Sequence, residues 1–403
     1  MQTAGMRRHA TSALPWDAAR ALAHATATPL APCSLPLADA VGSVLATPLL
    51  APSAVPPVDR SAMDGYAVCG SGPWRVVGVV KAASGLVGPL EDGQACTIVT
   101  GAAIPAGTTA VLPDEEAVVS APGQAGMVAG PVSSGRHIRR AGEECAAGET
   151  LLPAGVAVEP QVLGLAATLG LDRLTVIPKP LVASLVTGDE LVHRGPSGPG
   201  RVRDAIGPML PGLISRAGAT AAPELHLPDS RTALVDALTN TDAHLLLVSG
   251  SSASGPADHL RAALAALGAE LIIDGVACRP GHPQALARFD DGRLVLGLPG
   301  NPLAALTAFL TLGVAALQRL RGLELPTLPV APVPGGLACH PHSTRLVPVR
   351  VGPQGVVPVG HGGSAMLRGA AGADALAVVD PGPAEAIAAR LLPLDPGARP
   401  WGV

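Results

Sequence analysis

Aromatic side chains are scarce in this chain of 403 residues: phenylalanine, tryptophan and tyrosine together make up 1% of it, and Tyr66 is the only tyrosine. Charged residues make up only 14%, and the formal net charge is −4. Because the lysines and arginines are scattered, the sequence lacks the basic footprint that nucleic-acid binding requires. We therefore expect no nucleic-acid partner.

Cysteine pairs of the kind that hold metal clusters are missing as well. The six cysteines are widely spaced and form no CxxC pair, so neither a zinc nor an iron–sulfur site is indicated. Free thiols are typical of a reducing compartment, and we expect a cytoplasmic protein. No signal-peptide core follows Arg7 and Arg8, and the most apolar run, residues 303–317, is shorter than a membrane span. We expect no membrane partner and a buried helix in this run.

Two common catalytic signatures are also absent. No Gly-Lys-Ser or Gly-Lys-Thr follows the small-residue stretch 249–255, so this stretch is not a Walker loop. There is no nucleophile elbow and no Ser-His-Asp arrangement. His340 and His342 have no third ligand nearby in the sequence, which favours a turn over a metal site.

What the sequence has in quantity is apolar residues, at 48%, interrupted by 49 glycines and 42 prolines. Glycines and prolines at this frequency predict many short helices and strands, joined by loops that carry site residues. Residues 51–144 are rich in short Val, Thr and Gly segments, which indicates a small β-rich unit. Residues 179–322 alternate apolar strands with helical patterns, which predicts a mostly parallel sheet covered on both faces. Ligands bind such sheets at the carboxyl ends of the strands, where 187–191, 249–255 and 299–302 fall.

The surroundings of Tyr66 carry a specific signature. Residues 61–68 read Ser-Ala-Met-Asp-Gly-Tyr-Ala-Val, which resembles the SAMDGYAV motif of the molybdopterin molybdenumtransferase family, the MoeA and gephyrin E-domain proteins. Companion motifs follow in the family's order: TGAxxPxG at 100–107, continued by residues 110–112 and Glu115, NIRRxGED at 138–144, TGDEL at 187–191, GLPGNP at 297–302 and GHQGS at 360–364. The resemblance runs from about residue 35 to the C-terminus.

The resemblance implies a multidomain α/β and β fold. It comprises a discontinuous N-terminal domain (1–50 and 145–178), an inserted β-rich domain (51–144), a central three-layer α/β domain of the MogA type (179–322) and a small C-terminal β domain (323–403). The family's site lies between two subunits, so a homodimer is implied. An upstream adenylyltransferase and downstream molybdoenzymes are further expected partners.

The activity that the resemblance implies is insertion of molybdenum into adenylated molybdopterin with release of AMP, from molybdate and the pterin as substrates. It assigns catalysis to Asp64, Glu144, Glu190 and Asp258. Carboxylates near an anionic substrate require a cation, and Mg²⁺ held by Glu190 and Asp258 is the leading candidate. Substrate binding is assigned to Ser61, Thr100, Asp229, Ser249, Gly250, Arg279, Pro299, Asn301, Pro302 and Ser364.

The segment Gly300-Asn301-Pro302 also has a direct physical interpretation. Asparagine is a good N-cap and proline is favoured at the first helical position, so a helix should begin at Pro302. We expect its unpaired amides and positive dipole end to bind an anion, although a well-capped helix with no ligand is the plainer alternative.

Several positions depart from the family pattern. Ser251 stands at a glycine, and a need for positive φ there would strain the loop. Arg279 replaces the lysine of a Lys-Pro-Gly motif and brings a wider fork. The other departures are Glu144 for aspartate, Ile206 for asparagine, Ala253 for serine, and Gly275 and His282 at lysine positions.

These departures leave a second interpretation open, in which the chain is a weak or inactive paralogue that binds molybdopterin as a carrier or scaffold. A third, an adenylyltransferase resembling the related MogA fold, would fit only residues 179–322 and would leave the motif at 61–68 unexplained.

Overall fold

The computed structural model describes residues 13–81, 88–120, 126–251 and 259–397, and the chain divides into two compact units. The main unit comprises Met1–Ser34, Gly42–Ala46 and Thr175–Val403, and the β unit comprises Leu35–Val41 and Thr47–Leu174. This division is coarser than the four predicted domains, whose bounds stay a prediction.

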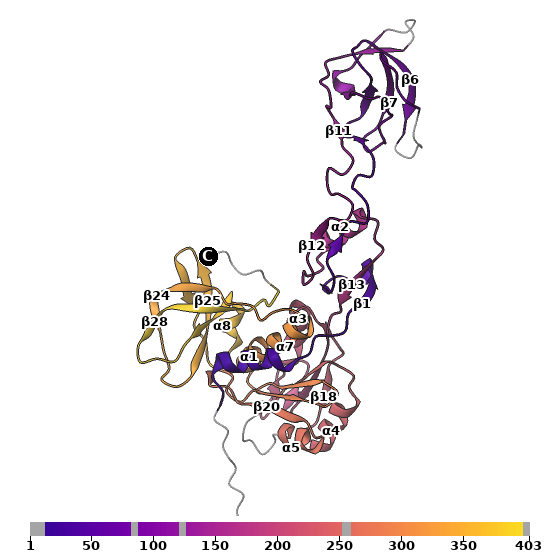
Figure 1. Cartoon of the computed structure of the whole chain (residues 1–403). Coiled ribbons are helices and arrows are strands. Elements are labelled where there is room, and N and C mark those ends of the chain that lie inside the picture. The colour runs from indigo at the N-terminus through magenta and orange to yellow at the C-terminus, as the bar shows by residue number, and fades with distance from the viewer. Residues whose placement is uncertain (1–12, 82–87, 121–125, 252–258, 398–403) are drawn as a thin grey trace, which may run out of the picture. The chain divides into compact units, whose positions relative to one another are not determined.

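The β unit is built on a six-stranded sheet of order β8-β5-β7-β6-β10-β9 (Figure 1). Its strands are β5 (Gly65–Val68), β6 (Trp74–Val80), β7 (Gln94–Ile98), β8 (Ala110–Pro113), β9 (Val118–Val119) and β10 (Met127–Ala129). Strand β5 carries the sequence motif in the interior of the sheet, where Tyr66 pairs with Thr97 on one side and Leu112 on the other. Side chains alternate across this strand, so it packs against two separate apolar clusters, with Ala67 in one and Val68 in the other.

Short strand pairs and one α-helix complete the β unit. β4 (Arg60–Ser61) pairs with β11 (Ile138–Arg139), and β3 (Leu49–Leu50) pairs with β12 (Thr150–Leu152). Helix α2 (Pro160–Thr168) has proline at its first position, and the 3₁₀ turns are η1 (Leu37–Asp39) and η2 (Asp114–Glu116). A separate three-stranded sheet has the order β1-β13-β2, formed by Cys33–Pro36, Arg173–Ile177 and Val44–Leu45.

The main unit contains a seven-stranded sheet. Its order is β17-β14-β19-β23-β22-β20, and β18 also pairs with β14. The strands are β14 (Leu181–Thr187), β17 (Thr220–Ala221), β18 (Leu225–Leu227), β19 (Leu245–Val248), β20 (Glu270–Asp274), β22 (Ala285–Arg288) and β23 (Leu294–Gly297). Strands from β17 and β18 to β23 are parallel, as predicted, whereas β22 runs antiparallel to both of its neighbours.

Helices cover both faces of this sheet, as Figure 1 shows with α1 and α7 on one side and α4 and α5 on the other. Leu245 and Leu247 of β19 point into the first layer, and Leu246 and Val248 point into the second. The first layer contains α1 (Trp16–Thr26), α3 (Leu210–Arg216), α6 (Pro302–Ala308) and α7 (Val314–Leu320), and the second contains α4 (Arg231–Asn240) and α5 (Leu260–Ala266).

The predicted buried helix runs without interruption from Pro302 to Leu320, through α6, a π-helical segment labelled η4 (Phe309–Gly313) and α7. At 19 residues it is long enough to cross a membrane, which corrects our shorter estimate, but 89% of its apolar window is buried inside the protein. Burial of this kind is typical of a core helix. Trp16 of α1, itself buried, donates its indole N–H to Thr311 Oγ1 in the π-helical segment at 3.0 Å.

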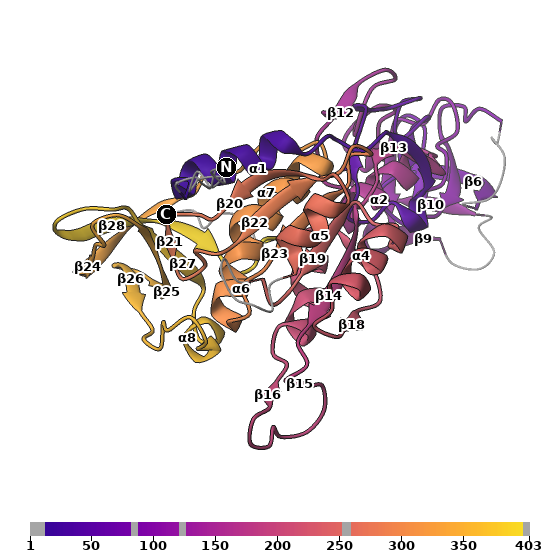
Figure 2. The same ribbon diagram turned by 90° about the horizontal axis from the view of Figure 1, so that it is seen from below.

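A second sheet follows in the main unit, of order β21-β25-β27-β28-β24, with β26 paired to β25 (Figure 2). Its elements are β21 (Cys278–Arg279), β24 (Val330–Ala338), β25 (Thr344–Gly352), β26 (Gly355–Pro358), α8 (Leu367–Ala371), β27 (Ala375–Val379) and β28 (Glu385–Pro393). Figure 2 also shows β15 (Leu191–Val192) and β16 (Val202–Arg203) extending as an arm beyond β14, before the 3₁₀ turn η3 (Gly207–Met209).

Candidate functional site

In the β unit, the predicted residues Asp64 and Thr100 lie in direct contact. The backbone N–H and the hydroxyl of Thr100 both donate to Asp64 Oδ1, at 2.6 and 2.8 Å. The backbone hydrogen bond is the larger cause, and the hydroxyl the second, of a pKa of Asp64 below its usual range. Asp64 is therefore an exposed carboxylate that stays ionised in mild acid.

Backbone hydrogen bonds bring these two motifs together. Ser61 N–H donates to Ala102 O, and Gly101 N–H donates to Ser61 O. The Ser61 hydroxyl donates to Met63 O at 2.6 Å and so closes the turn that leads to Asp64. Ser61 is buried, which gives it a local structural role beside any contact with substrate.

Glu144 lies on the neighbouring ladder of the same unit. Strand β11 pairs Ile138 with Ser61, and Arg139, the next residue, forms an ion pair of 2.9 Å with Glu144. The longer side chain that replaces the family's aspartate therefore reaches a cation within its own loop.

In the main unit, site residues gather at the carboxyl ends of β14, β18 and β19, as the sheet topology predicts. Thr187 Oγ1 donates to Ser249 O at 2.7 Å. Gly250 has φ +81, and a Cβ there would lie 2.6 Å from Thr187 Oγ1, so only glycine fits. Asp229 lines the same small pocket as Thr187, Ser249 and Gly250. Its amide donates to Asp189 Oδ1 and its Oδ2 accepts from the Asp189 amide, each at 3.3 Å.

Of the two predicted metal ligands, Glu190 is an exposed residue on this edge, and Asp258 lies outside the described residues, as does Ala253. The carboxylate of Glu190 folds back over Gly188, where a Cβ would lie 2.9 Å from Oε2. Gly188 has φ +145, so this hollow depends on the absence of a side chain.

Ser251 is not strained, which corrects the concern raised by its replacement of a glycine. Among the described non-glycine residues, only His137 and His361 have positive φ. The Ser251 amide donates to Leu298 O at 3.0 Å, while its buried hydroxyl finds no partner among the described residues. The substitution therefore adds a buried hydroxyl group that needs a hydrogen bond, and it leaves the backbone conformation unstrained.

A cavity of about 600 Å³ brings together four predicted substrate-binding residues from distant segments. These are Arg279, Pro299, Asn301 and Ser364. Cys278 also lines this cavity, and burial raises the pKa of its thiol to about 12. It is therefore a neutral thiol here and not a thiolate ligand.

The start of the helix at Pro302 differs from the prediction. Helix α6 does begin at Pro302 after Asn301, but the Asn301 side chain makes no capping hydrogen bond. The amides of Leu303 and Ala304 donate to the backbone oxygen of Ser364 at 3.0 and 3.1 Å. These amides are therefore not free for an anion, and Ser364 caps the helix through its main chain.

Positive charge in the cavity comes from side chains instead. Arg279 and Arg345 both line it, and neither forms an ion pair with a carboxylate within the described parts of the chain. Burial first, and then the positive charges of Arg279, His342 and Arg345, lower the pKa of His340. Arg345 was missed by sequence reasoning because it belongs to no motif; its position opposite Arg279 in the β21–β25 ladder identifies it.

The structure also explains two other departures from the family pattern, Gly275 and Ile206. Gly275 has φ +91 and a Cβ there would lie 3.5 Å from His282 O, so the backbone here is suited to glycine and not to a lysine. Ile206 is buried in the apolar core and donates its amide to Asp204 Oδ1 at 2.9 Å.

Comparison with known proteins finds matches along most of the chain. Residues 14–170 match the MoeA N-terminal region (domain I and II), 183–319 match a probable molybdopterin binding domain, and 330–388 match the MoeA C-terminal region (domain IV).

Individual relatives extend over most of both chains. A protein of Synechococcus elongatus named molybdopterin molybdenumtransferase is 36% identical over 353 residues, 81% of this chain and 86% of the relative. Molybdopterin molybdenumtransferase 2 of Mycobacterium tuberculosis is 35% identical over 321 residues, 74% of this chain and 77% of the relative. The crystal structure of the molybdopterin biosynthesis MoeA protein from Pyrococcus horikoshii has the same fold, with a TM-score of 0.72 at 22% identity over 94% of this chain and 99% of that one.

Proposed function

The chain belongs to the molybdopterin molybdenumtransferase family, and from this premise we propose that it inserts molybdenum into adenylated molybdopterin and releases AMP. The substrates are then the pterin nucleotide and molybdate, both of which are anions. A protein with a net charge of −4 needs a local concentration of positive charge to bind them.

The observation that carries the proposal is the cavity with Arg279 and Arg345. It combines about 600 Å³ of space with two guanidinium groups that have no ion-pair partner among the described residues. Guanidinium forks bind the oxygens of phosphate and similar oxyanions in pairs. We assign molybdate or a pterin phosphate to this position.

The edge formed by Thr187, Ser249 and Gly250 adjoins the cavity, because a Cβ on Gly300 would lie 3.7 Å from the Gly250 Cα. Glycine and small hydroxyl residues let a ligand approach the backbone closely. This edge would therefore position the pterin nucleotide beside the oxyanion.

Glu190 fits the role of a magnesium ligand. Its carboxylate lies over the hollow at Gly188 and offers the hard oxygen donors that Mg²⁺ prefers. A bound Mg²⁺ would offset the charge of the phosphate oxygens. The role of Asp258 as a second magnesium ligand is proposed from the family resemblance alone.

Asp64, Thr100 and Glu144 belong to the β unit, and we propose that they complete the site of a second chain in a homodimer. Thr100 would hold the Asp64 carboxylate in place through the two hydrogen bonds described above. In the cell, the protein would then act in the cytoplasm and pass its product to a molybdoenzyme.

The alternative, a carrier that binds molybdopterin without turnover, is favoured by the buried hydroxyl of Ser251 beside the Gly250 loop, which has no hydrogen-bond partner in the part of the chain that the structure describes. Release of AMP separates the two functions, since a carrier would bind the nucleotide and leave its phosphoanhydride intact.

Replacing the cavity arginines tests the assignment of the anion. Arg345→Gln should raise the KM for molybdate and lower turnover by at least ~10-fold, the scale of one charged hydrogen bond. Arg350→Gln is a matched control, because Arg350 lies on the same strand and donates to Gly372 O. Equal kinetics for Arg345→Gln, Arg350→Gln and the wild type would contradict the assignment.

A further inference from the structure

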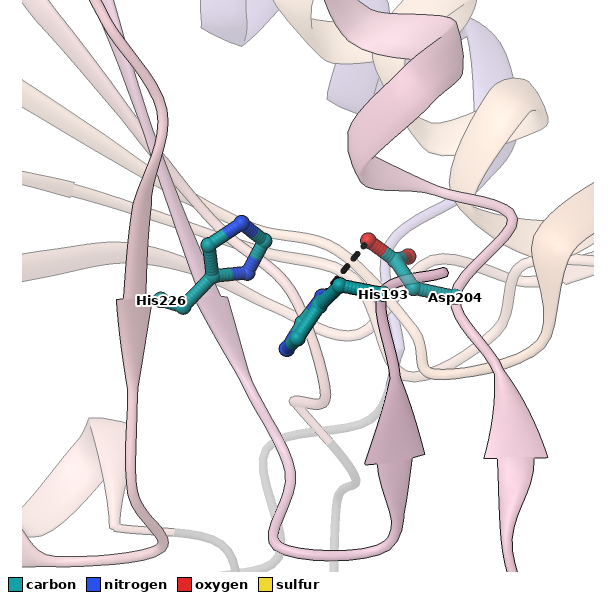
Figure 3. A group of neighbouring side chains, drawn as sticks. All are labelled: His193, Asp204 and His226. Carbon is teal, nitrogen blue, oxygen red and sulfur yellow. Dashed lines mark ion pairs between the residues drawn. The ribbon is translucent and has the colours of Figure 1, made fainter. Parts of the chain in front are cut away.

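Three side chains outside the proposed substrate site converge at the base of the β15–β16 arm (Figure 3). We call them the His–Asp–His cluster: His193, Asp204 and His226. Their three ligand atoms all lie within 4.8 Å of one another. His193 Nδ1 is 3.7 Å from Asp204 Oδ2, and the two imidazole centroids are also 3.7 Å apart.

Three separate segments supply this cluster. His193 directly follows β15 and Asp204 directly follows β16, and the ladder that pairs Val192 with Arg203 places them opposite each other. The Asp204 amide donates to Val192 O at 3.1 Å and continues this pairing. His226 comes from β18, which pairs with β14 in the sheet. The cluster therefore joins the arm to the edge of the sheet.

Asp204 is oriented by the backbone and buried. Its Oδ1 accepts from the amides of Ile206 and Gly207, at 2.9 and 3.0 Å, which leaves Oδ2 directed at His193. The side chain is only 4% exposed. A carboxylate this deeply buried needs a positive partner, and a neutral imidazole does not supply a full charge.

A second carboxylate, that of Glu224 just before β18, supports the cluster. Glu224 and His226 are two residues apart and share a face of the extended chain. Glu224 Oε1 lies 2.9 Å from His226 Nε2. A Cβ on Gly207 would lie 2.5 Å from Asp204 Oδ2 and 2.6 Å from both Glu224 oxygens, so both carboxylates border the same hollow.

We propose that the His–Asp–His cluster binds a divalent transition-metal ion of the zinc class, with Glu224 orienting His226. Two neutral imidazoles and two carboxylates carry a charge of −2, which a divalent ion balances. Zinc ligands in a tetrahedral site lie about 3.4 Å apart, so ligand atoms that lie within 4.8 Å of one another need to close by about 1.4 Å or less. Because Glu224 holds Nε2, His226 would coordinate through Nδ1, in the carboxylate–histidine–metal arrangement common at zinc sites.

The ligand types separate this site from the proposed magnesium site. Two imidazole nitrogens suit zinc and its neighbours in the first transition series, whereas Mg²⁺ is bound by oxygen. The bound ion would fix the arm, which begins beside Glu190: the Glu190 carbonyl accepts from Val202 N–H at 3.0 Å. An ion bound by the His–Asp–His cluster would therefore stabilise the position of Glu190. Binding of this ion can nevertheless be measured without the pterin substrate.

The test is zinc binding by the full chain, measured by equilibrium dialysis and by calorimetry with Zn²⁺ alone. The wild type should bind stoichiometric Zn²⁺, and Co²⁺ should give the visible absorption of a low-coordinate site with nitrogen ligands. His193→Gln combined with His226→Gln should weaken Zn²⁺ binding at least ~100-fold, and Glu224→Gln about 10-fold, as loss of an orienting carboxylate does.

His342→Gln is the matched control, because His342 is an exposed histidine of another histidine pair in the same unit. It should bind Zn²⁺ like the wild type. Zn²⁺ should also raise the Tm of the wild type and of His342→Gln, but not of the double variant, whose fold is checked by circular dichroism. Absence of stoichiometric Zn²⁺ binding by the wild type, or equal affinity in the double variant, would overturn the proposal and leave a hydrogen-bonded cluster only.

Discussion

Asp64 shows how a single residue is prepared by its neighbours. Two hydrogen bonds from Thr100, the first from its amide and the second from its hydroxyl, lower the pKa of this carboxyl group although it is exposed. A depressed pKa contributes stability that is present above the pKa of the unfolded chain and is lost as the pH falls through the lower, folded pKa. The stability that Asp64 contributes is therefore present near neutral pH and is lost in acid.

Thr100→Val removes the hydroxyl and keeps the amide, so the pKa of Asp64 should rise part of the way toward its usual range. An NMR titration of the Asp64 carboxyl carbon measures this shift. Thr108→Val is the control, since the Thr108 hydroxyl donates to the backbone oxygen of Pro105 and not to Asp64. An Asp64 titration unchanged by Thr100→Val would show that the hydroxyl contributes nothing.

At this scale, sequence reasoning could name residues but not their partners. The motifs placed both Asp64 and Thr100 in the site, whereas the hydrogen bonds between them depend on a turn closed by Ser61. The amides at the start of α6 were expected to be free because their acceptor, Ser364 O, comes from a segment about 60 residues away along the chain. Such long-range pairing leaves no local signal.

Among the elements, the helix from Pro302 to Leu320 organises the main unit. It contains two buried threonines in different settings. Thr311 accepts the indole N–H of Trp16, while the hydroxyl of Thr307 has no partner among the described residues. A buried polar group without a partner costs free energy, whereas a paired one does not.

Replacing each threonine by valine, which has nearly the same volume, separates these two cases. Thr311→Val leaves the Trp16 indole unpaired and should lower the free energy of unfolding by about 1–3 kcal/mol. Thr307→Val should be neutral or slightly stabilising. Urea unfolding of both variants measures the difference, and equal destabilisation would show that the indole hydrogen bond does not matter.

The glycine in strand β5 is a second test at this scale. Gly65 has φ +151, and a Cβ there would lie 2.1 Å from Leu112 O in the paired strand. Gly65→Ala should therefore lower the free energy of unfolding by about 2 kcal/mol or more. In Gly78→Ala the new Cβ meets nothing within 4 Å in strand β6, so that variant should unfold close to the wild type. Similar stability of the two variants would contradict this explanation of the motif's glycine.

Elements with strong periodicity were predicted well. The strand–helix alternation predicted for residues 179–322 is present, and the buried helix expected over 303–317 runs from Pro302 to Leu320. Strands β15 and β16 are two residues each, too short for any period, so the arm and its histidines were missed. Strands β20 and β22 were missed as well, and β22 reverses direction in the sheet, which apolarity alone does not show.

For the whole molecule, the proposed site divides between the β unit and the main unit, and the homodimer proposal assigns each half to a different chain. Asp64→Asn and Glu190→Gln should each abolish turnover. After subunit exchange, a mixture should recover about a quarter of wild-type activity, because half the dimers are mixed and each mixed dimer has one intact site.

The matched control mixes two variants of the β unit, Asp64→Asn and Glu144→Gln, which should recover nothing because every site lacks one of these acids. Exchange is verified by mass spectrometry of differently tagged chains. Failure of Asp64→Asn and Glu190→Gln to complement after verified exchange would contradict a site shared between chains.

The most direct measurement of the central claim is a turnover assay of the purified wild-type chain with adenylated molybdopterin, molybdate and Mg²⁺. We predict that AMP appears together with an equal amount of molybdenum-loaded pterin, and that omitting Mg²⁺ stops both. Tight binding of the adenylated pterin with neither AMP nor molybdenum-loaded pterin formed would contradict the enzyme and identify the chain as a carrier.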